Sequence, residues 1–292
     1  MTLLINKAYK RFLTLFLIKL VFPLKNLIYE MFHSDYTIIT SSVKPLSYNW
    51  GDDVSIQLCK MVNPQRKYIV NRYTWNLFRR DDVLCIGSII NWMTSPNSII
   101  WGSGIVYPDR ELSAIPKKVL AVRGPLTRQY LLKRGIDCPE VYGDPALLFP
   151  RYYKPHIEKK YRLGIIPHFR DKNNPIILKN SQDSTVKVID VQKIQPWHRF
   201  IDEICSCEYI ASSSLHGLII SDAYGIPNVW IEFEGGEQKR FAFHDYLQSV
   251  KKDTDPLILS LSTTIEDICN MCNNIENDIN LDKLMNSCPF KY

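Results

Sequence analysis

The sequence predicts an α/β protein in which two Rossmann-like domains, each built on a parallel sheet, face one another across a cleft. Short apolar runs of strand length alternate with segments of helical periodicity along most of the 292 residues. A polar, proline-broken stretch at residues 150–160 separates a first alternating set from a second, as an interdomain linker would. Polar side chains follow the ends of several strands, and a parallel sheet gathers those ends on one edge.

The composition is that of a folded globular protein with a mild basic excess. Hydrophobic residues make up 46% and charged residues 23%, and the net charge is +6. This charge favours anionic ligands or an anionic membrane, but it is too small to indicate nucleic acid, which we do not expect as a partner. The eight cysteines lack zinc-site spacing, so we expect no metal and a reducing, cytoplasmic location. The aromatic content of 12% suits either ordinary packing or rings that stack on sugars in a cleft.

Residues 1–35 form a basic and apolar segment ahead of the first domain. Lys19 and Pro23 interrupt the apolar run at residues 12–24, so neither a spanning helix nor a secretory signal is expected. Two interpretations remain open. The segment is either an amphipathic helix that lies on the anionic inner face of the cell membrane or a basic helix packed on the domain.

The N-terminal domain is expected at residues 36–150. Its predicted strands lie at residues 36–41, 83–88, 99–101 and 118–122. A helix is predicted over residues 54–61, where Asp52 or Asp53 can cap its first turn. A second helix is predicted from Pro125 to Lys133, because proline suits a first helical position and Gly135 suits the position after the end.

The C-terminal domain is expected at residues 151–250, followed by a helical tail at residues 251–292 that packs back on the first domain. The predicted strands of this domain lie at residues 162–166, 186–190, 209–211 and 229–231, and a helix is predicted over residues 197–206. A short helix should follow the third of these strands, because Leu215, Leu218 and Ile219 have helical spacing. Gly225 and Pro227 then end it.

The stretch around His216 is the strongest functional candidate. It places a serine-rich turn and one imidazole at the exit of a strand and the start of a helix. In open α/β sheets ligands bind at that place, and the free N–H groups of a helix N-terminus attract anions. His216 titrates near neutral pH, which suits proton transfer.

Other polar residues recur at strand ends, and each has an ordinary structural interpretation as well. Arg123 could be a surface ion pair, and Lys239 with Arg240 could be a solvated loop. Their joint placement with His168 and His216 favours a pocket for a small, doubly anionic ligand.

Several motifs together resemble the polysaccharide pyruvyl transferase family. They are Asn49-x-Gly51-Asp52, Gly102-x-Gly104, Val122-Arg123-Gly124-Pro125, Gly143-Asp144-Pro145, Ile166-Pro167-His168 and Ser214-Leu-His216-Gly217 with Ala223-Tyr-Gly225-Ile-Pro227. They cover roughly residues 36–250 and leave the first 35 residues outside the resemblance. The resemblance implies a fold similar to two-domain GT-B glycosyltransferases. It also implies phosphoenolpyruvate as the donor, a saccharide acceptor and a pyruvate ketal product in bacterial surface polysaccharide biosynthesis, with no further cofactor.

This chemistry suggests a role for each candidate residue. We expect His216 as the acid/base and Arg123 as the clamp on the donor. The remaining donor-binding candidates, on the C-terminal domain, are Ser212, Ser213, Ser214, Leu215, Gly217, His168, Lys239 and Arg240. The acceptor-binding candidates, on the N-terminal domain, are Asn49, Asp52, Asp53 and Ser103. Many family members carry an arginine where this chain has Ser214, so another cation must replace it.

Two alternatives of other kinds remain open. A nucleotide-sugar glycosyltransferase on the same fold would need a carboxylate for the ribose, and Glu232 and Glu234 lie near the right place. A non-catalytic saccharide-binding subunit is favoured by Ser214, the departure from the family motif. With a lipid-linked acceptor, the basic N-terminal segment would fit a peripheral position on the membrane.

Overall fold

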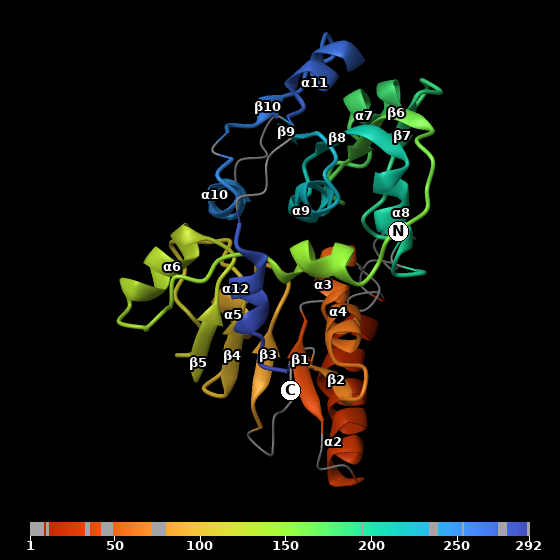
Figure 1. The fold of residues 1–292 in the computed structure, drawn as a ribbon. Helices are drawn as coiled ribbons and strands as arrows, with labels where there is room; N and C mark the ends of the chain where they lie inside the picture. The colour runs from red at the N-terminus through yellow and green to blue at the C-terminus, as the bar shows by residue number, and fades with distance from the viewer. Residues whose placement is uncertain are drawn as a thin grey trace.

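The computed structural model describes residue 9 and residues 12–32, 36–41, 49–71, 80–193, 195–233, 239–252, 254–273 and 279–290. Within these ranges the chain forms two five-stranded sheets, and all strand pairs in both are parallel. One sheet lies above the other in Figure 1. The prediction of an α/β protein with two parallel sheets is confirmed.

The first sheet has the strand order β2-β1-β3-β4-β5. Its strands are β1 (Thr37–Thr40), β2 (Tyr68–Asn71), β3 (Asp82–Leu84), β4 (Ser98–Trp101) and β5 (Lys118–Ala121). The helices of this half are α3 (Trp50–Asp53), α4 (Ser55–Val62), α5 (Ile90–Met93) and α6 (Pro125–Leu132). The sequence did not predict β2 or α5, because β2 is a short edge strand and α5 is a single turn with no helical periodicity to detect.

The second sheet has the strand order β10-β9-β8-β6-β7. Its strands are β6 (Tyr161–Ile166), β7 (Val186–Val188), β8 (Cys207–Ser212), β9 (Asn228–Glu232) and β10 (Leu257–Ile258). Its helices are α7 (Pro175–Asn180), α8 (Arg199–Cys205), α9 (Leu215–Ala223), α10 (Arg240–Ser249) and α11 (Ile265–Met271). The predicted helix after β8 is confirmed, and Gly225, with a φ of 65°, follows its end as expected.

Both sheets have the same topology. When the strands of each half are counted in chain order, each sheet reads 2-1-3-4-5 across. The strand order therefore reverses between β1 and β3 in one sheet and between β6 and β8 in the other. Such switch points leave a crevice at the carboxyl ends of the strands, where ligands of doubly wound proteins bind.

Several segments join the two halves, and three of them are helices that cross from one half to the other or pack between them. The 3₁₀ helix η2 (Pro145–Arg151) packs against α9, and its residues from Pro145 to Phe149 are all buried. Helix α10 packs against α6 of the first half. Helix α12 (Leu281–Asn286) lies on the first sheet, where the Leu284 carbonyl accepts a hydrogen bond from Trp101 Nε1 at 3.0 Å. One hydrophobic cluster consequently runs through both halves.

The N-terminal segment is helical at residues 12–32, which includes the π-helical turn η1 (Leu17–Val21) and helix α2 (Phe22–Phe32). Pro23 does not end the helix, because the π turn, in which Phe22 N–H bonds to Leu17 O, shifts the hydrogen-bond pattern just before it. Among the described residues one helix, Phe12–Tyr29, is long and apolar enough by length and composition to cross a membrane, with a mean hydropathy of 1.6.

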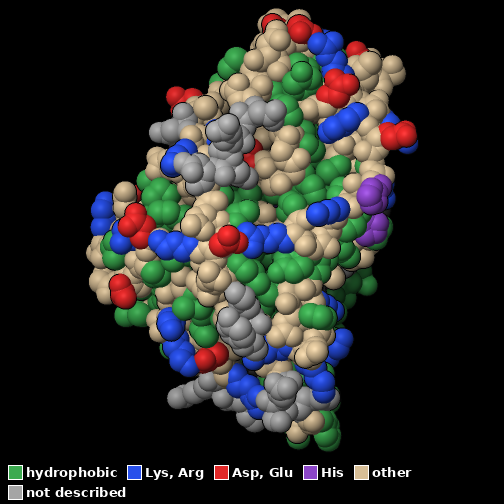
Figure 2. All heavy atoms as spheres, in the orientation of Figure 1, with side chains coloured by type: hydrophobic (Ala, Val, Ile, Leu, Met, Phe, Trp, Pro, Cys, Tyr) green, Lys and Arg blue, Asp and Glu red, His purple; other side chains and the backbone are tan. Residues whose placement is uncertain are grey.

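Most of this helix is not covered by the rest of the protein. Only 6% of the Phe12–Tyr29 window is buried, and Phe12, Leu24 and Ile28 are each at least half exposed. Figure 2 shows hydrophobic side chains reaching the surface at the lower right, where Figure 1 places α2. The helix also contacts the first domain, where Asn26 Nδ2 donates a hydrogen bond to Val70 O at 3.3 Å, so both interpretations of this segment stay predictions.

Candidate active site

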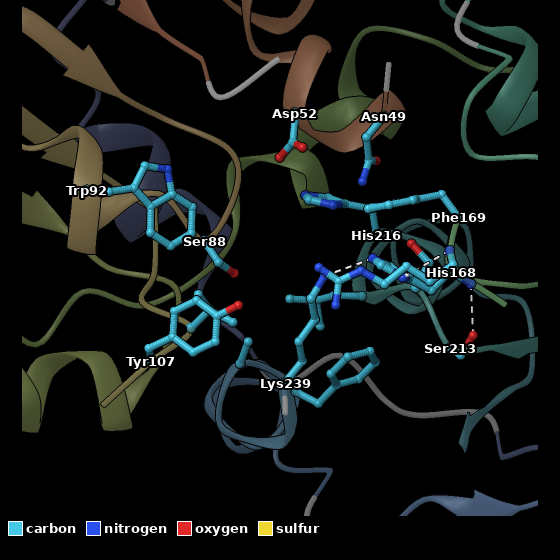
Figure 3. A pocket seen from close by; sticks show the side chains of 16 residues that line it. Asn49, Asp52, Ser88, Trp92, Tyr107, His168, Phe169, Ser213, His216 and Lys239 are labelled. Carbon is cyan, nitrogen blue, oxygen red and sulfur yellow. Dashed lines mark hydrogen bonds between the residues drawn. The ribbon is translucent and has the colours of Figure 1, made fainter. Parts of the chain in front are cut away.

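A cavity of about 400 Å³ lies where the two switch points meet. Its lining includes Asn49 and Asp52 after β1, Ser88 after β3, His168 after β6, and residues 213–216 after β8 (Figure 3). The carboxyl ends of the central strands of both sheets thus open on one space. Residues that are far apart in the sequence meet there because the carboxyl ends of the strands of both sheets face this cavity.

His216 lies in the first turn of α9, and its ring lines the cavity although the residue is only 8% exposed. Gly51 of α3 leaves room for the ring. A Cβ atom at residue 51 would lie 1.9 Å from His216 Nδ1, which is far closer than any normal contact. The glycine of the Asn49-x-Gly51-Asp52 motif is therefore needed for the position of the imidazole.

Asp144, which belongs to the Gly143-Asp144-Pro145 motif, faces His216. His216 Nε2 lies 3.9 Å from Asp144 Oδ2, and neither of these buried atoms has a hydrogen-bond partner among the described residues. The other oxygen, Oδ1, accepts a hydrogen bond from Ala146 N–H at 2.9 Å and so caps η2. Because η2 packs against α9, the cap holds the second carboxylate oxygen toward the imidazole.

Burial shifts the acid–base properties of this pair in opposite directions. Loss of hydration raises the pKa of Asp144 to about 7. Burial, with the nearby charges of Arg123 and Lys239, lowers the pKa of His216 to about 3. Near neutral pH the imidazole is therefore neutral, and the carboxyl group is poised to hold or release a proton.

Lys239 is the cation nearest to the second histidine. Its Nζ donates a hydrogen bond to His168 Nε2 at 2.8 Å, so that the imidazole is the acceptor. Burial is the main cause that lowers the pKa of His168 to about 3, and the positive charges of Lys239 and Arg170 add to it. The imidazole is therefore neutral near pH 7. The Ser213 hydroxyl fixes the same loop by accepting a hydrogen bond from His168 N–H at 2.9 Å. Lys239 and Arg170 are the cationic side chains of the cavity lining.

Arg123 does not line the cavity. It is fully buried, and its guanidinium forms an ion pair with Asp245 of α10 at 3.0 Å. It also donates hydrogen bonds to the Ser88 hydroxyl and to Ile105 O. Arg123, which was expected to clamp the donor, thus links the two halves of the chain. Between its guanidinium and the cavity lies Ser88, whose hydroxyl it contacts.

The other predicted site residues divide into two groups. Those that line the cavity are Asn49, Asp52, His168, Ser213, Ser214, Leu215, His216 and Lys239. Those that do not are Asp53, Ser103, Ser212, Gly217 and Arg240. Ser103 and Ser212 are buried and bond to backbone carbonyls, whereas Arg240 pairs with Glu232 at 2.8 Å. Glu234, the other carboxylate of the glycosyltransferase alternative, lies outside the described residues.

The cavity lining also contains residues that were not among the predicted site residues, including Ser88, Trp92, Tyr107 and Phe169. Ser88 is the last residue of the strand predicted at residues 83–88, which overlaps β3, and its place at a strand end is the signal that could have identified it. Trp92 and Tyr107 lie on a single helical turn and in a loop, where no periodicity marks a side chain as facing a cavity.

Metal binding has no support in the described ranges. No group of three or more His, Cys, Asp or Glu side chains there is arranged to hold an ion. All eight cysteines are free thiols.

The fold and the cavity define a class: α/β proteins with two parallel sheets whose switch points share one polar, cation-containing ligand site. Within this class the chain belongs to the polysaccharide pyruvyl transferase family, whose family model matches residues 3–234. The match begins at residue 3, so the likeness reaches further toward the N-terminus than the motifs indicated.

Two curated relatives and one solved structure are similar to the chain. An uncharacterized protein of Acanthamoeba polyphaga mimivirus is 33% identical over 168 residues, or 56% of this chain and 58% of that protein. The succinoglycan biosynthesis protein ExoV of Rhizobium meliloti is 24% identical over 75% of this chain and 66% of its own length. A functionally uncharacterized Klebsiella pneumoniae protein of known structure, 13% identical, aligns with 82% of this chain and 98% of its own with a TM-score of 0.45. The chain thus spans less than two thirds of the length of either curated relative.

Proposed function

We propose that this protein transfers the pyruvyl group of phosphoenolpyruvate to two hydroxyls of a saccharide, forming a cyclic ketal and releasing phosphate in surface polysaccharide biosynthesis. The observation that carries the proposal is the cavity at both switch points that is lined by cations and neutral imidazoles, with the buried Asp144 carboxyl group beside His216. Family membership supports a transferase that acts on polysaccharides or their precursors. An architecture like that of GT-B glycosyltransferases, with donor and acceptor on opposite sides, is part of the proposal.

The donor fits the cavity end that contains Lys239. Phosphoenolpyruvate carries a carboxylate and a phosphate, and both require cations or N–H donors. Lys239 and Arg170 supply charge, and the first turn of α9 supplies the positive end of a helix. In this proposal Lys239 and Arg170 take the place of the arginine that many relatives carry at the position of Ser214.

The proton steps fit the pair formed by His216 and Asp144. The methylene carbon of the donor takes a proton, and a cationic centre develops at C2. One sugar hydroxyl adds to C2 and loses its proton, the bond from C2 to the phosphate oxygen breaks, and a second hydroxyl closes the ring with loss of its proton. His216 delivers the first proton from Nδ1 while its Nε2 takes a proton from Asp144, which holds one near neutral pH. Of the two hydroxyl protons that are lost, one returns to Asp144 through His216 and the other leaves with the phosphate.

Donor turnover and donor binding test the proposal. We expect calorimetric binding of phosphoenolpyruvate without binding of uridine diphosphate, and phosphate release that depends on an acceptor saccharide. His216→Asn should lower turnover by about 10²–10⁴-fold. His198→Asn is the matched control, because that imidazole is partly exposed and pairs with Asp202 rather than lining the cavity.

Each outcome separates this function from its alternatives. Nucleotide binding in place of phosphoenolpyruvate would support a glycosyltransferase, and saccharide binding with no phosphate release would support a non-catalytic subunit. Pyruvylated glycan should also appear in mass spectra of the reaction, so its absence with intact, folded protein contradicts the proposal.

A membrane position for the N-terminal helix belongs to the same proposal. A lipid-linked acceptor at the cytoplasmic face would bring the enzyme to the bilayer, and the exposed apolar side chains of residues 12–32 would hold it there with help from Lys19 and Lys25. Liposomes with anionic lipid should carry the full chain on flotation but not a chain that begins at residue 36. Equal recovery of both chains would remove this part of the proposal.

A further inference from the structure

One wall of the cavity differs chemically from the end that contains Lys239 and the histidines. Trp92 of α5 and Tyr107 of the loop after β4 both line it, with ring centroids 6.3 Å apart and ring planes tilted by 45°. Figure 3 shows both rings on one side of the cavity and Lys239 with His168 on the other. We propose that this aromatic wall is the subsite for the acceptor saccharide, which stacks one face of a pyranose ring on it.

The wall is held in place by a buried asparagine. Asn91 Oδ1 accepts hydrogen bonds from Val106 N–H and Tyr107 N–H at 3.2 and 3.3 Å. Its Nδ2 donates to Tyr107 O at 3.1 Å and to Arg110 O at 3.3 Å. One side chain next to Trp92 therefore fixes the backbone that carries Tyr107, so the relative position of the two rings is set before a ligand arrives.

The surroundings of the two rings suit a sugar, which has both ring faces and hydroxyls, better than they suit a purely apolar ligand. The Arg110 guanidinium lies 4.3 Å from the centroid of the Tyr107 ring and restricts its motion. Ser88 is also part of the lining, and its Oγ already accepts a hydrogen bond from Arg123. The hydroxyl proton of Ser88 can therefore be donated to a ligand hydroxyl, while Asn49 and Asp52 offer acceptors on the adjoining side.

The location also suits the proposed reaction, on which this inference rests. The cavity volume of about 400 Å³ exceeds what a three-carbon donor needs and lies in the usual range for small-molecule sites. A pyranose on the aromatic wall would direct its hydroxyls toward the part of the cavity that contains His216. Donor and acceptor would then occupy opposite sides of one space, as ketal formation requires.

The test measures saccharide binding directly, with methyl β-D-galactopyranoside, methyl β-D-glucopyranoside and methyl α-D-mannopyranoside as probes in saturation-transfer NMR titrations. We expect at least one probe to bind the wild type and to bind about tenfold more weakly after either Trp92→Ala or Tyr107→Ala. Trp92→Phe and Tyr107→Phe retain a ring and should stay within threefold of the wild type. Tyr152→Ala is the matched control, because Tyr152 is a partly exposed aromatic residue outside the cavity lining.

Calorimetry with phosphoenolpyruvate on the same proteins separates this inference from the proposed function. If a sugar binds through the wall and phosphoenolpyruvate does not bind, the subsite stands and the proposed donor is wrong. If phosphoenolpyruvate binds but the alanine variants, shown by thermal unfolding to be folded, bind the sugars as the wild type does, the aromatic wall is not the acceptor subsite. Absence of binding of all three probes to the wild type also overturns the subsite.

Discussion

Replacing Gly51 by alanine tests whether the position of His216 controls turnover. Gly51 lies in helix α3, where alanine would by itself be favoured by about 1 kcal/mol. The new methyl group would lie 1.9 Å from His216 Nδ1 and 2.3 Å from Cγ. Since non-bonded carbon contacts are normally about 3.5 Å or longer, the imidazole must move by roughly 1.5 Å.

The expected effects on stability and on turnover differ greatly in size. Overpacking a filled site costs about 1–3 kcal/mol, so the helix preference leaves a net loss of roughly 0–2 kcal/mol. A domain with a typical stability of about 5–15 kcal/mol remains folded after such a loss. A displacement of about 1 Å at a reacting group can cost about 10²-fold in rate, so turnover should fall far more than stability.

Two measurements on each protein decide the matter: urea unfolding, and phosphate release from phosphoenolpyruvate in the presence of acceptor. Gly135→Ala is the matched control, because a Cβ at residue 135 meets nothing within 4 Å, while its φ of 72° makes alanine mildly strained. The control should lose about 1 kcal/mol of stability with unchanged turnover. If Gly51→Ala retains turnover within threefold of the wild type, the reasoning about His216 fails.

Three further predictions follow from the buried charges. Asp144→Asn keeps the hydrogen bond to Ala146 N–H but removes the acid, so turnover should fall by about 10²-fold. In the wild type kcat/KM should decline above about pH 7, where the carboxyl group loses its proton, and this decline should be absent from the pH–rate profile of the variant. Arg123→Met leaves the buried Asp245 carboxylate unpaired and should cost about 3–5 kcal/mol in urea unfolding; unchanged stability with weaker binding of phosphoenolpyruvate would instead restore Arg123 as a donor clamp. His168 has a lowered pKa in the folded protein, so below about pH 6.5 the unfolded chain binds more protons than the folded one. On acidification the stability of the wild type should therefore fall by up to about 1.4 kcal/mol per pH unit more than that of His168→Asn. Parallel stability curves for the two proteins would contradict the lowered pKa of His168.

The sequence predicted the parts of the site that depend on strand ends. Asn49, Asp52, His168 and His216 each follow a strand, and the parallel topology was enough to expect them on one edge. Lys239 was also among the candidates, although its contact with His168 depends on the path of a loop that no local pattern specifies. The alternation of apolar runs was sufficient for the α/β class because the central strands are short, largely buried and separated from one another by helices or loops.

Contacts between distant segments could not be predicted in the same way. The partner of Arg123 is Asp245, which lies 122 residues away in a helix of the other half, and nothing near either residue in the sequence indicates the pairing. Asp144 belonged to a recognised motif, but its burial beside His216 follows from the packing of η2 on α9. Trp92 lies on one helical turn, and its orientation depends on the hydrogen bonds of Asn91.

Helix α10 has a mechanical consequence for the whole molecule. On one side Asp245 holds Arg123, and on the other Phe243 stacks on Trp230 with ring centroids 4.6 Å apart. Moving the two sheets apart would break the ion pair between Arg123 and Asp245 or separate the stacked rings, and both contacts stabilise the assembled arrangement. We therefore expect the assembled arrangement to be the main form of the protein before substrate binds. The apparent affinity for substrate is then not lowered, because no large fraction of the molecules has an open conformation that cannot bind.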